Sequence, residues 1–318
     1  MKRVFALILA FIMFLSLAAC GGEPNESGSL TFITGSDTGT YYAFGSAMSE
    51  RVSESTDTQV TVISSNGSQA NIEALRAGDA DVAFVQSDVM AYGYNGTRFF
   101  AETGAVTTFS TVAAMYIEQV QLVTLDPMIR SVADLAGKRV SIGADGSGVY
   151  YNAIDILDVY GLTEEDIIPS FYAFDETVEA LQNGQIDAGF IVAGVPTNAV
   201  ASLAAANDVY LVSLDDEHIS ALIASSPYYA RNTIGFEIYG TLEDVTTVGI
   251  SAVVIASDSA SEEDVYNFIS AVFDNLNTIS HAKAKEVSVD FAASVTDVPY
   301  HPGAARYFRE KGLTVPTK

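Results

Sequence analysis

The chain has 318 residues, is 49% hydrophobic and carries a formal net charge of −25 at pH 7. Single domains usually stop growing at about 250–300 residues, so this length favours two lobes. The negative charge repels phosphate backbones and anionic head groups, which makes nucleic acid a poor partner. One cysteine excludes an intrachain disulfide, and three scattered histidines offer no metal-ligand spacing.

Residues 1–19 have the pattern of a targeting segment. Lys2 and Arg3 precede the apolar run VFALILAFIMFLSLAA, which is short for a membrane span of about 20 residues. The run ends at LAAC, and small residues before the lone Cys20 resemble a bacterial lipobox, which implies cleavage before Cys20 and lipidation of its sulfur. The alternative is an ordinary signal peptide or an uncleaved anchor with an incidental cysteine. Residues 20–29, rich in Gly and Ser, would form a flexible tether, and the mature charge would be 13 − 40 = −27.

From residue 30 onward, apolar runs alternate with helical patterns, which is typical of an α/β fold with largely parallel sheets. We expect strands at 30–34, 59–64, 82–86, 111–124, 139–143, 168–173, 188–192, 209–213 and 247–257. We expect helices at 40–53, 68–77, 87–92, 148–160, 175–182, 196–206, 216–225, 261–277, 281–291 and 302–311.

The sequence also contains an internal repeat. NIEALRAGDADVAFVQSDVM at 71–90 aligns with TVEALQNGQIDAGFIVAGVP at 177–196, an offset of 106 residues. The loops GSDTGTYY and GADGSGVYY align at an offset of 109. Common supersecondary patterns produce some such matches by chance, but two blocks in the same order indicate two similar α/β lobes.

The apolar runs TVAAMYIEQVQLVTL and TTVGISAVVIAS exceed the usual strand length of about 5–6 residues. They flank the second repeat, so we interpret them as segments that cross between the lobes. Lobe 1 would comprise 30–117 plus 247–318, and lobe 2 would comprise 118–246. Two crossings make a hinge, and a hinge between two lobes makes a cleft that can close.

Four loops follow strands at the ends where ligands bind in open α/β sheets: GSDTGTYY, SSNGSQAN, GADGSGVYY and VAGVP, the last with Gly194. Small residues before a helix leave unpaired N–H groups at its positive end, which suits an anion without any Lys or Arg. Ser68 and Ser147 add hydroxyl donors, and Gln86 ends a strand. The alternative is that these residues only cap helices and make turns. One tyrosine of each Tyr-Tyr pair should face inward, to line the cleft or to pack in the core.

Sequence motifs for catalysis are absent. The chain contains no G-x-S-x-G, Walker A, H-E-x-x-H or cysteine nucleophile pattern, and its GSG lacks the third glycine of a dinucleotide fingerprint. We therefore expect neither an enzyme nor a cofactor or metal.

Taken together, the motifs resemble the TAXI family of solute receptors, the extracytoplasmic binding subunits of TRAP transporters. The matching pieces are ITGSDTGTYYAFGSAMS, SSNGSQANIEALRAGDADVAFVQSD, MYIEQVQLVTLD, DLAGKRVSIGADGSGVYYNA, ALQNGQIDAGFIVAGVP and HPGAARYFREKG. The resemblance implies a type II periplasmic-binding-protein fold, in which two lobes close by a hinge on a central ligand cleft. It also implies a lipid-anchored, extracytoplasmic monomer that delivers a small carboxylate, such as glutamate, glutamine or 2-oxoglutarate, to a membrane permease.

Carried over position by position, the resemblance assigns ligand contacts to three loops and one strand end. These are Gly39, Thr40 and Tyr41; Asn66, Gly67 and Ser68; Gln86; and Gly146, Ser147 and Gly148. The chain departs from the family at Val149, where a hydroxyl is usual, and at Asp145, where an uncharged residue is usual. An acid at Asp145, and similarly Asp37, would repel an anion or pair with an ammonium group, which favours an amino acid over a dicarboxylate.

Three other functions stay open on sequence alone. A ligand-sensing receptor of the same fold would feed a signalling partner instead of a permease. An ABC-type binding protein would work with an ATPase subunit. A surface enzyme is disfavoured because nucleophile, metal and cofactor motifs are missing.

Overall fold

The computed structural model describes residues 28–318. The expected signal peptide and Cys20 lie outside the described residues. Within them, no helix has both the length and the apolar character needed to cross a bilayer.

The chain begins with strands alternating with helices, as the apolar pattern predicts. These elements are β1 (Ser29–Ile33), α2 (Thr40–Ser55), β2 (Gln59–Ile63), α3 (Ser68–Ala77), β3 (Val82–Gln86), α4 (Ser87–Asn95) and α5 (Phe100–Thr103). The long strand β4 (Phe109–Thr124) follows.

A second set of alternating elements comes next. It comprises η1 (Val132–Leu135), β5 (Arg139–Ser141), α6 (Gly148–Val159), η2 (Glu164–Asp166), β6 (Ile168–Ser170), α7 (Phe174–Gln182), β7 (Ala188–Ala193), α8 (Asn198–Ala206), β8 (Tyr210–Leu211), α9 (Asp216–Ser225), β9 (Ala230–Ile234) and α10 (Phe236–Tyr239). The chain returns through β10 (Val245–Ser257) and ends with α11 (Glu262–Phe273), η3 (Leu276–Thr278), η4 (Ala282–Lys285), α12 (Val289–Ala292) and α13 (Pro302–Glu310).

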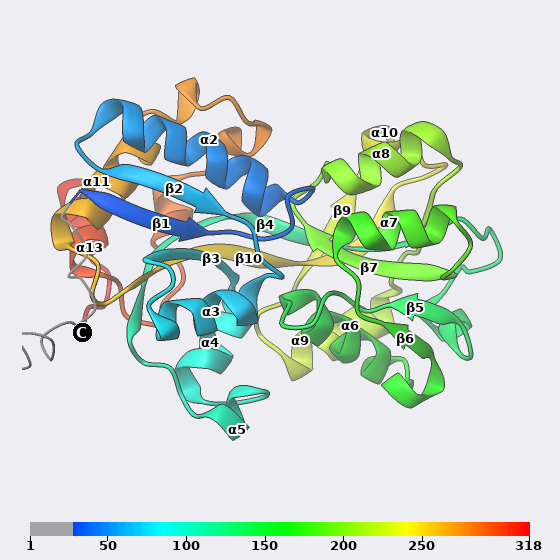
Figure 1. The fold of residues 1–318 in the computed structure, drawn as a ribbon. Coiled ribbons are helices and arrows are strands. Elements are labelled where there is room, and N and C mark those ends of the chain that lie inside the picture. Colours follow the sequence, from blue (N-terminus) through cyan, green and yellow to red (C-terminus); the bar gives the residue numbers. More distant parts are fainter. Residues whose placement is uncertain (1–27) are drawn as a thin grey trace, which may run out of the picture.

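One sheet runs through the whole molecule, in the order β2-β1-β3-β10-β4-β7-β5-β6. β4 and β10 pair antiparallel in its middle, from Gly249 opposite Gln119 to Ser257 opposite Phe109. Figure 1 shows these two strands running between two groups of elements, with α2, α3, α11 and α13 around one and α6 to α10 around the other. The strands β8 and β9 extend β4 and β10 on the second side.

The buried side chains divide in the same way. One large cluster around Phe44, Phe84 and Phe268 draws on residues 30–116 and 252–315, whereas another around Leu157 and Phe190 draws on 120–250. Every residue of the central strand β3 is buried, as expected for a strand covered on both faces. Each side of the molecule therefore has its own core, and β4 and β10 contribute to both.

The helix expected at 281–291 is wrong. This segment forms the short helices η4 and α12 instead. The side chain of Ser288 accepts a hydrogen bond from the N–H of Phe291, which starts a new helix and interrupts the expected one. The helix expected at 261–277 also ends early, at Phe273, and the short helices α5 and α10 and the strand β9 were not expected.

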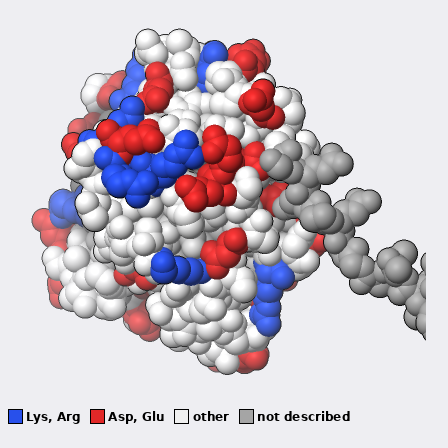
Figure 2. Space-filling model, turned by 90° about the vertical axis from the view of Figure 1, so that its left-hand side faces the viewer, with Lys and Arg blue, Asp and Glu red and all other residues white. Residues whose placement is uncertain are grey.

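Basic side chains are interspersed among acidic ones at the end of the molecule that carries α11 and α13 (Figure 2). Three of the basic residues there pair with acids: Arg306 with Glu263 at 2.8 Å, Lys311 with Asp274 at 2.8 Å, and Lys318 with Asp258. This end therefore presents paired charges rather than a basic surface.

Candidate functional site

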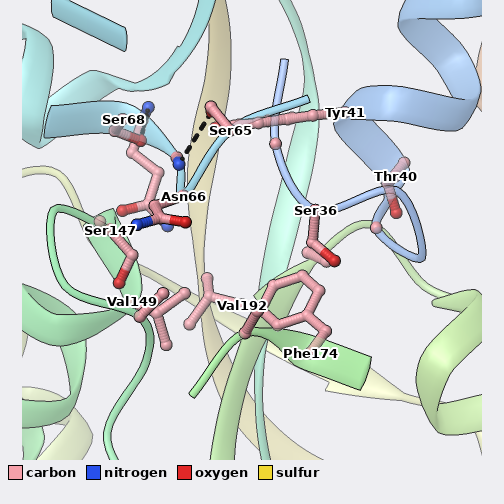
Figure 3. Close-up of a pocket in the computed structure, with 18 of the residues that line it drawn as sticks. Ser36, Thr40, Tyr41, Ser65, Asn66, Ser68, Ser147, Val149, Phe174 and Val192 are labelled. Atoms are coloured by element: carbon pink, nitrogen blue, oxygen red, sulfur yellow. Dashed lines mark hydrogen bonds between the residues drawn. The ribbon is translucent and has the colours of Figure 1, made fainter. Parts of the chain in front are cut away.

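A small cavity lies where the two groups of elements meet, beside β4. Its volume is about 40 Å³, which is room for about three water molecules at roughly 10–15 Å³ each. Figure 3 shows Thr40, Tyr41, Ser65, Asn66 and Ser68 on one side of it and Ser147, Val149, Phe174 and Val192 on the other. The lining residues are Gly35, Ser36, Gly39, Thr40, Tyr41, Ser65, Asn66, Gly67, Ser68, Gln86, Glu118, Ala144, Ser147, Gly148, Val149, Ala173, Phe174, Val192 and Ala193.

The structure brings nine of the twelve predicted ligand contacts to this cavity: Gly39, Thr40, Tyr41, Asn66, Gly67, Ser68, Gln86, Ser147 and Gly148. The other three, Asp145, Gly146 and Gly194, are not among its lining residues. Their carbonyl oxygens instead accept hydrogen bonds from the opposite side, from Asn66 Nδ2 (3.0 Å), the Ala70 N–H (3.0 Å) and Thr40 Oγ1 (2.8 Å) respectively.

The tyrosine pairs differ in their roles. Tyr41 lines the cavity with its ring stacked on Phe84, at a centroid separation of 4.6 Å. In the second pair the buried tyrosine is Tyr151, the counterpart of Tyr42, and its hydroxyl donates to Gln69 Oε1 at 2.6 Å, outside the cavity. One tyrosine of each pair therefore faces inward as expected, and only Tyr41 is placed to meet a ligand.

Three helices begin at the cavity. The residues preceding α2 and α3, Gly39 and Gly67, make no side-chain capping bond. The first-turn N–H groups of these helices therefore lack side-chain caps and intrahelical partners, although the N–H of Ala70 on α3 donates to the Gly146 carbonyl oxygen. Ser147 caps α6 by accepting from the N–H of Tyr150 at 3.2 Å. The helix N-termini, two on one side of the cavity and one on the other, bring partial positive charge to it without any Lys or Arg.

The contacts around the rim hold the two sides closely together. Gly148 lies against Gln86: a Cβ added at Gly148 would be 2.0 Å from Gln86 Oε1 and 3.0 Å from Ser68 Oγ. Only a glycine permits this approach. The structure is thus a closed form of the cleft.

Three polar side chains, those of Tyr41, Gln86 and Glu118, meet at one end of the cavity. The amide Nε2 of Gln86 donates to Glu118 Oε2 at 3.1 Å. Gln86 Oε1 is buried without a hydrogen-bond partner, whereas the buried Tyr41 hydroxyl lies within hydrogen-bonding reach of the Glu118 carboxyl and of Ser68. Buried polar atoms without partners are rare and costly in native proteins, so Gln86 Oε1 is a candidate acceptor for a ligand group.

Glu118 is the one charged side chain among the lining residues, and its side chain is 2% exposed. Burial raises the pKa of Glu118 to about 8, against the lowering effects of the Gln86 and Tyr41 hydrogen bonds and of Lys283. The Lys283 ammonium is itself held by Glu286 at 2.8 Å. At neutral pH the Glu118 carboxyl of the empty cavity is therefore mostly protonated.

Sequence reasoning missed Glu118, although MYIEQVQLVTL contained the signal. A carboxyl in the middle of a long strand that is otherwise buried needs a partner or a function. Phe174, whose ring lies 3.2 Å from a Cβ position at Gly39, was also missed, because one aromatic at a helix start has no distinguishing pattern.

A second polar cluster joins the two sides outside the cavity. Asn152 on α6 donates to Asp88 Oδ2 on α4 at 3.2 Å and to the Tyr229 hydroxyl at 2.9 Å. Arg98 reaches across to Asp155 at 2.5 Å. Burial raises the pKa of Asp88 to about 7.

The chain matches the NMT1-like family over residues 32–312, which is most of its length. It belongs to the NMT1-like family. The match includes the elements that build the cavity from Gly35 to Ala193.

Solved structures similar to this NMT1-like protein include one from Bordetella bronchiseptica RB50, with 17% identity, 83% of this chain and 77% of that chain covered, and a TM-score of 0.54. A structure described as a periplasmic transporter has 13% identity, coverage of 90% and 93%, and a TM-score of 0.53. A zinc-bound ligand-binding component of an ABC-type import system from Staphylococcus aureus has 10% identity, coverage of 92% and 94%, and a TM-score of 0.51.

At such identities the similarity shows the fold alone. It confirms the expected α/β, two-lobe periplasmic-binding-protein fold. The S. aureus structure contains zinc. In this protein, residues 28–318 contain no group of three or more His, Cys, Asp or Glu side chains that could hold a metal ion.

Proposed function

We propose that this protein is an extracytoplasmic solute receptor that captures a small carboxylate or amino acid, similar to glutamate, glutamine or 2-oxoglutarate, and delivers it to a TRAP-type permease. The observation that carries the proposal is the cavity at which α2, α3 and α6 begin. Its helix N-termini suit a carboxylate, and a hinge between two lobes would let a ligand enter it. The motifs shared with TAXI receptors support the permease class.

We further propose that lobe 1 comprises 30–117 plus 247–318 and lobe 2 comprises 118–246, with β4 and β10 as the hinge. The separate cores on the two sides support this division. The rim contacts between Gln86 and Gly148, and between Thr40 and Gly194, would then form when the lobes close and break when they open.

Binding is tested by calorimetry of the purified protein with glutamate, glutamine, 2-oxoglutarate and succinate, together with small-angle X-ray scattering. We expect one ligand per chain, and a radius of gyration that falls when ligand is added because the lobes close. Saturable binding without a change in radius would contradict hinge closure, and no binding at all would contradict the ligand class.

The TRAP and ABC alternatives differ in their energy source. The fold shared with the S. aureus ABC component makes an ABC-type receptor the second candidate. The two transporter classes are separated by measuring ligand uptake into membrane vesicles. The vesicles contain the permease, and the purified receptor is added to them. We expect uptake that is driven by an ion gradient without ATP, whereas uptake that requires ATP would favour an ABC-type receptor. A receptor that supports no uptake but changes a signalling output would favour the sensor.

We propose that the mature chain is anchored to the membrane through Cys20. Replacement of Cys20 by serine (Cys20→Ser) removes the sulfur that would carry the lipid, so we expect the protein to move from the membrane fraction to the soluble fraction. A conservative change in the tether, Ser27→Ala, is the control and should leave the protein in the membrane fraction. Unchanged membrane association of the Cys20→Ser variant, with no lipid on the wild-type N-terminus by mass spectrometry, would refute the anchor.

Catalysis is not proposed. Among the residues lining the cavity, no serine or threonine hydroxyl is hydrogen-bonded to a histidine or carboxylate that would activate it. Turnover of a bound ligand would reopen this possibility.

A further inference from the structure

We propose that the ligand carries an ammonium group that binds beside Glu118, and that its capture displaces the proton of that carboxyl into solution. The inference rests on the proposed function and narrows the ligand class to amino acids or related zwitterions.

The geometry provides a complete set of acceptors for an ammonium group. An ammonium group has three N–H donors and no acceptor. Three buried acceptors meet at one end of the cavity: the Glu118 carboxylate, Gln86 Oε1 and the Tyr41 hydroxyl oxygen. Gln86 is fixed by its bond to Glu118, and the Tyr41 ring by stacking on Phe84, so the acceptors are held in place before binding.

Hydrogen-bond donors, in contrast, lie at the N-terminal ends of α2 and α3. The N–H groups at the beginning of α2 and α3 attract a carboxylate, while no Lys, Arg or His side chain lines the cavity. A ligand with negative charges alone would satisfy the helix ends but leave Gln86 Oε1 unpaired. A zwitterion satisfies both ends, which is why the structure favours it.

The number of protons released on ligand binding depends on the Glu118 carboxyl. In the empty cavity Glu118 holds its proton near neutral pH because burial disfavours the charged form. When an ammonium group arrives, the O–H bond of Glu118 breaks, the proton passes to the buffer, and the carboxylate pairs with the ligand, which keeps its own protons. The groups that face Glu118 are Tyr41 from α2, Gln86 from β3, Asp88 from α4, Tyr116 from β4 and Lys283 from η4.

The test is calorimetry of the purified protein against matched pairs: each standard amino acid and the 2-oxo acid with the same side chain. Titrations in buffers of different ionisation enthalpy report the protons released. We expect the tightest ligand to be an amine, its 2-oxo counterpart to bind roughly 100-fold more weakly, and release of close to one proton at pH 7. Affinity for the amine should rise as the pH is raised from 6 to 8.

Two variants separate the effect of the Glu118 carboxyl on ligand binding from the effect of removing any acidic side chain. Glu118→Gln keeps the size and an acceptor for Gln86, but it should abolish proton release and weaken the amine roughly 10- to 100-fold. Glu102→Gln, at an exposed position on α5 that does not line the cavity, is the control and should change neither.

An amine-free acid as the tightest ligand, or binding of an amine without proton release, would overturn this inference while the proposed receptor function stands. Binding of no member of the panel would overturn both.

Discussion

Substitution of Gly148 by alanine (Gly148→Ala) is expected to weaken ligand binding roughly 10- to 100-fold, because overpacking a close contact costs about 1–3 kcal/mol. The added Cβ would lie 2.0 Å from Gln86 Oε1 and 2.6 Å from Gln86 Cδ. Either the lobes stay apart, or the Gln86 side chain is pushed into a cavity of about 40 Å³. Both outcomes remove the space or the contacts that a ligand needs.

The fold should tolerate the same substitution. Gly148 is the first residue of α6, outside the left-handed region, and alanine is a better helix former than glycine. Calorimetry measures the loss of affinity, and X-ray scattering measures whether ligand still reduces the radius of gyration. Thermal unfolding without ligand checks that the fold is intact.

A second variant identifies the cause. Adding Gln86→Ala to Gly148→Ala removes the side chain that the new Cβ meets, so we expect closure on ligand addition to return even though the Gln86 contact is lost. Wild-type affinity in Gly148→Ala would contradict the closed geometry described here.

Asp88→Asn should make the protein increasingly more stable than the wild type as the pH rises. Asp88 is fully buried and accepts bonds from the Val89 N–H at 2.7 Å and from Asn152. Burial raises the pKa of Asp88 from 3.8 to about 7. Between these values the unfolded chain loses the proton and the folded chain keeps it, so stability is lost as the pH rises through this window.

The size of the effect follows from the shift. One pKa unit corresponds to about 1.4 kcal/mol, so the free energy of unfolding of Asp88→Asn relative to wild type should rise by roughly 3 kcal/mol between pH 4 and pH 7. Urea unfolding at several pH values measures this difference. A constant difference for Asp88→Asn would show that the carboxyl is ionised in the folded protein.

Much of the fold was predictable because each signal was local and physical. Gly78 and Gly184, expected to end two helices, adopt φ values of 81° and 63°, which residues with a side chain rarely adopt. The long runs around residues 111–124 and 247–257 are β4 and β10, since only strands that pass between two cores stay apolar for so long. The error at 281–291 arose because Ser288 acts through a capping bond that periodicity does not reveal.

The site was predictable where it depends on the backbone and less so where it depends on single side chains. Small residues before helices marked the loops at Gly39, Gly67 and Gly148, which line the cavity. Asp145 and Asp37 are not among the lining residues, and Asp145 contributes its carbonyl oxygen to the rim. Glu118 was overlooked because its importance comes from lying beside Gln86 and Tyr41, which are distant in sequence.

The most direct test of the central claim is mass spectrometry of the small molecules released when protein purified from its own cells is denatured. A closed cleft that is lined by helix N-termini and by the unpaired Gln86 Oε1 predicts one small carboxylate-bearing molecule, released at close to one per chain, that restores the closed form when added back. If the protein releases nothing and no carboxylate or amino acid changes its radius of gyration or its thermal stability, the account of this protein as a solute receptor is contradicted.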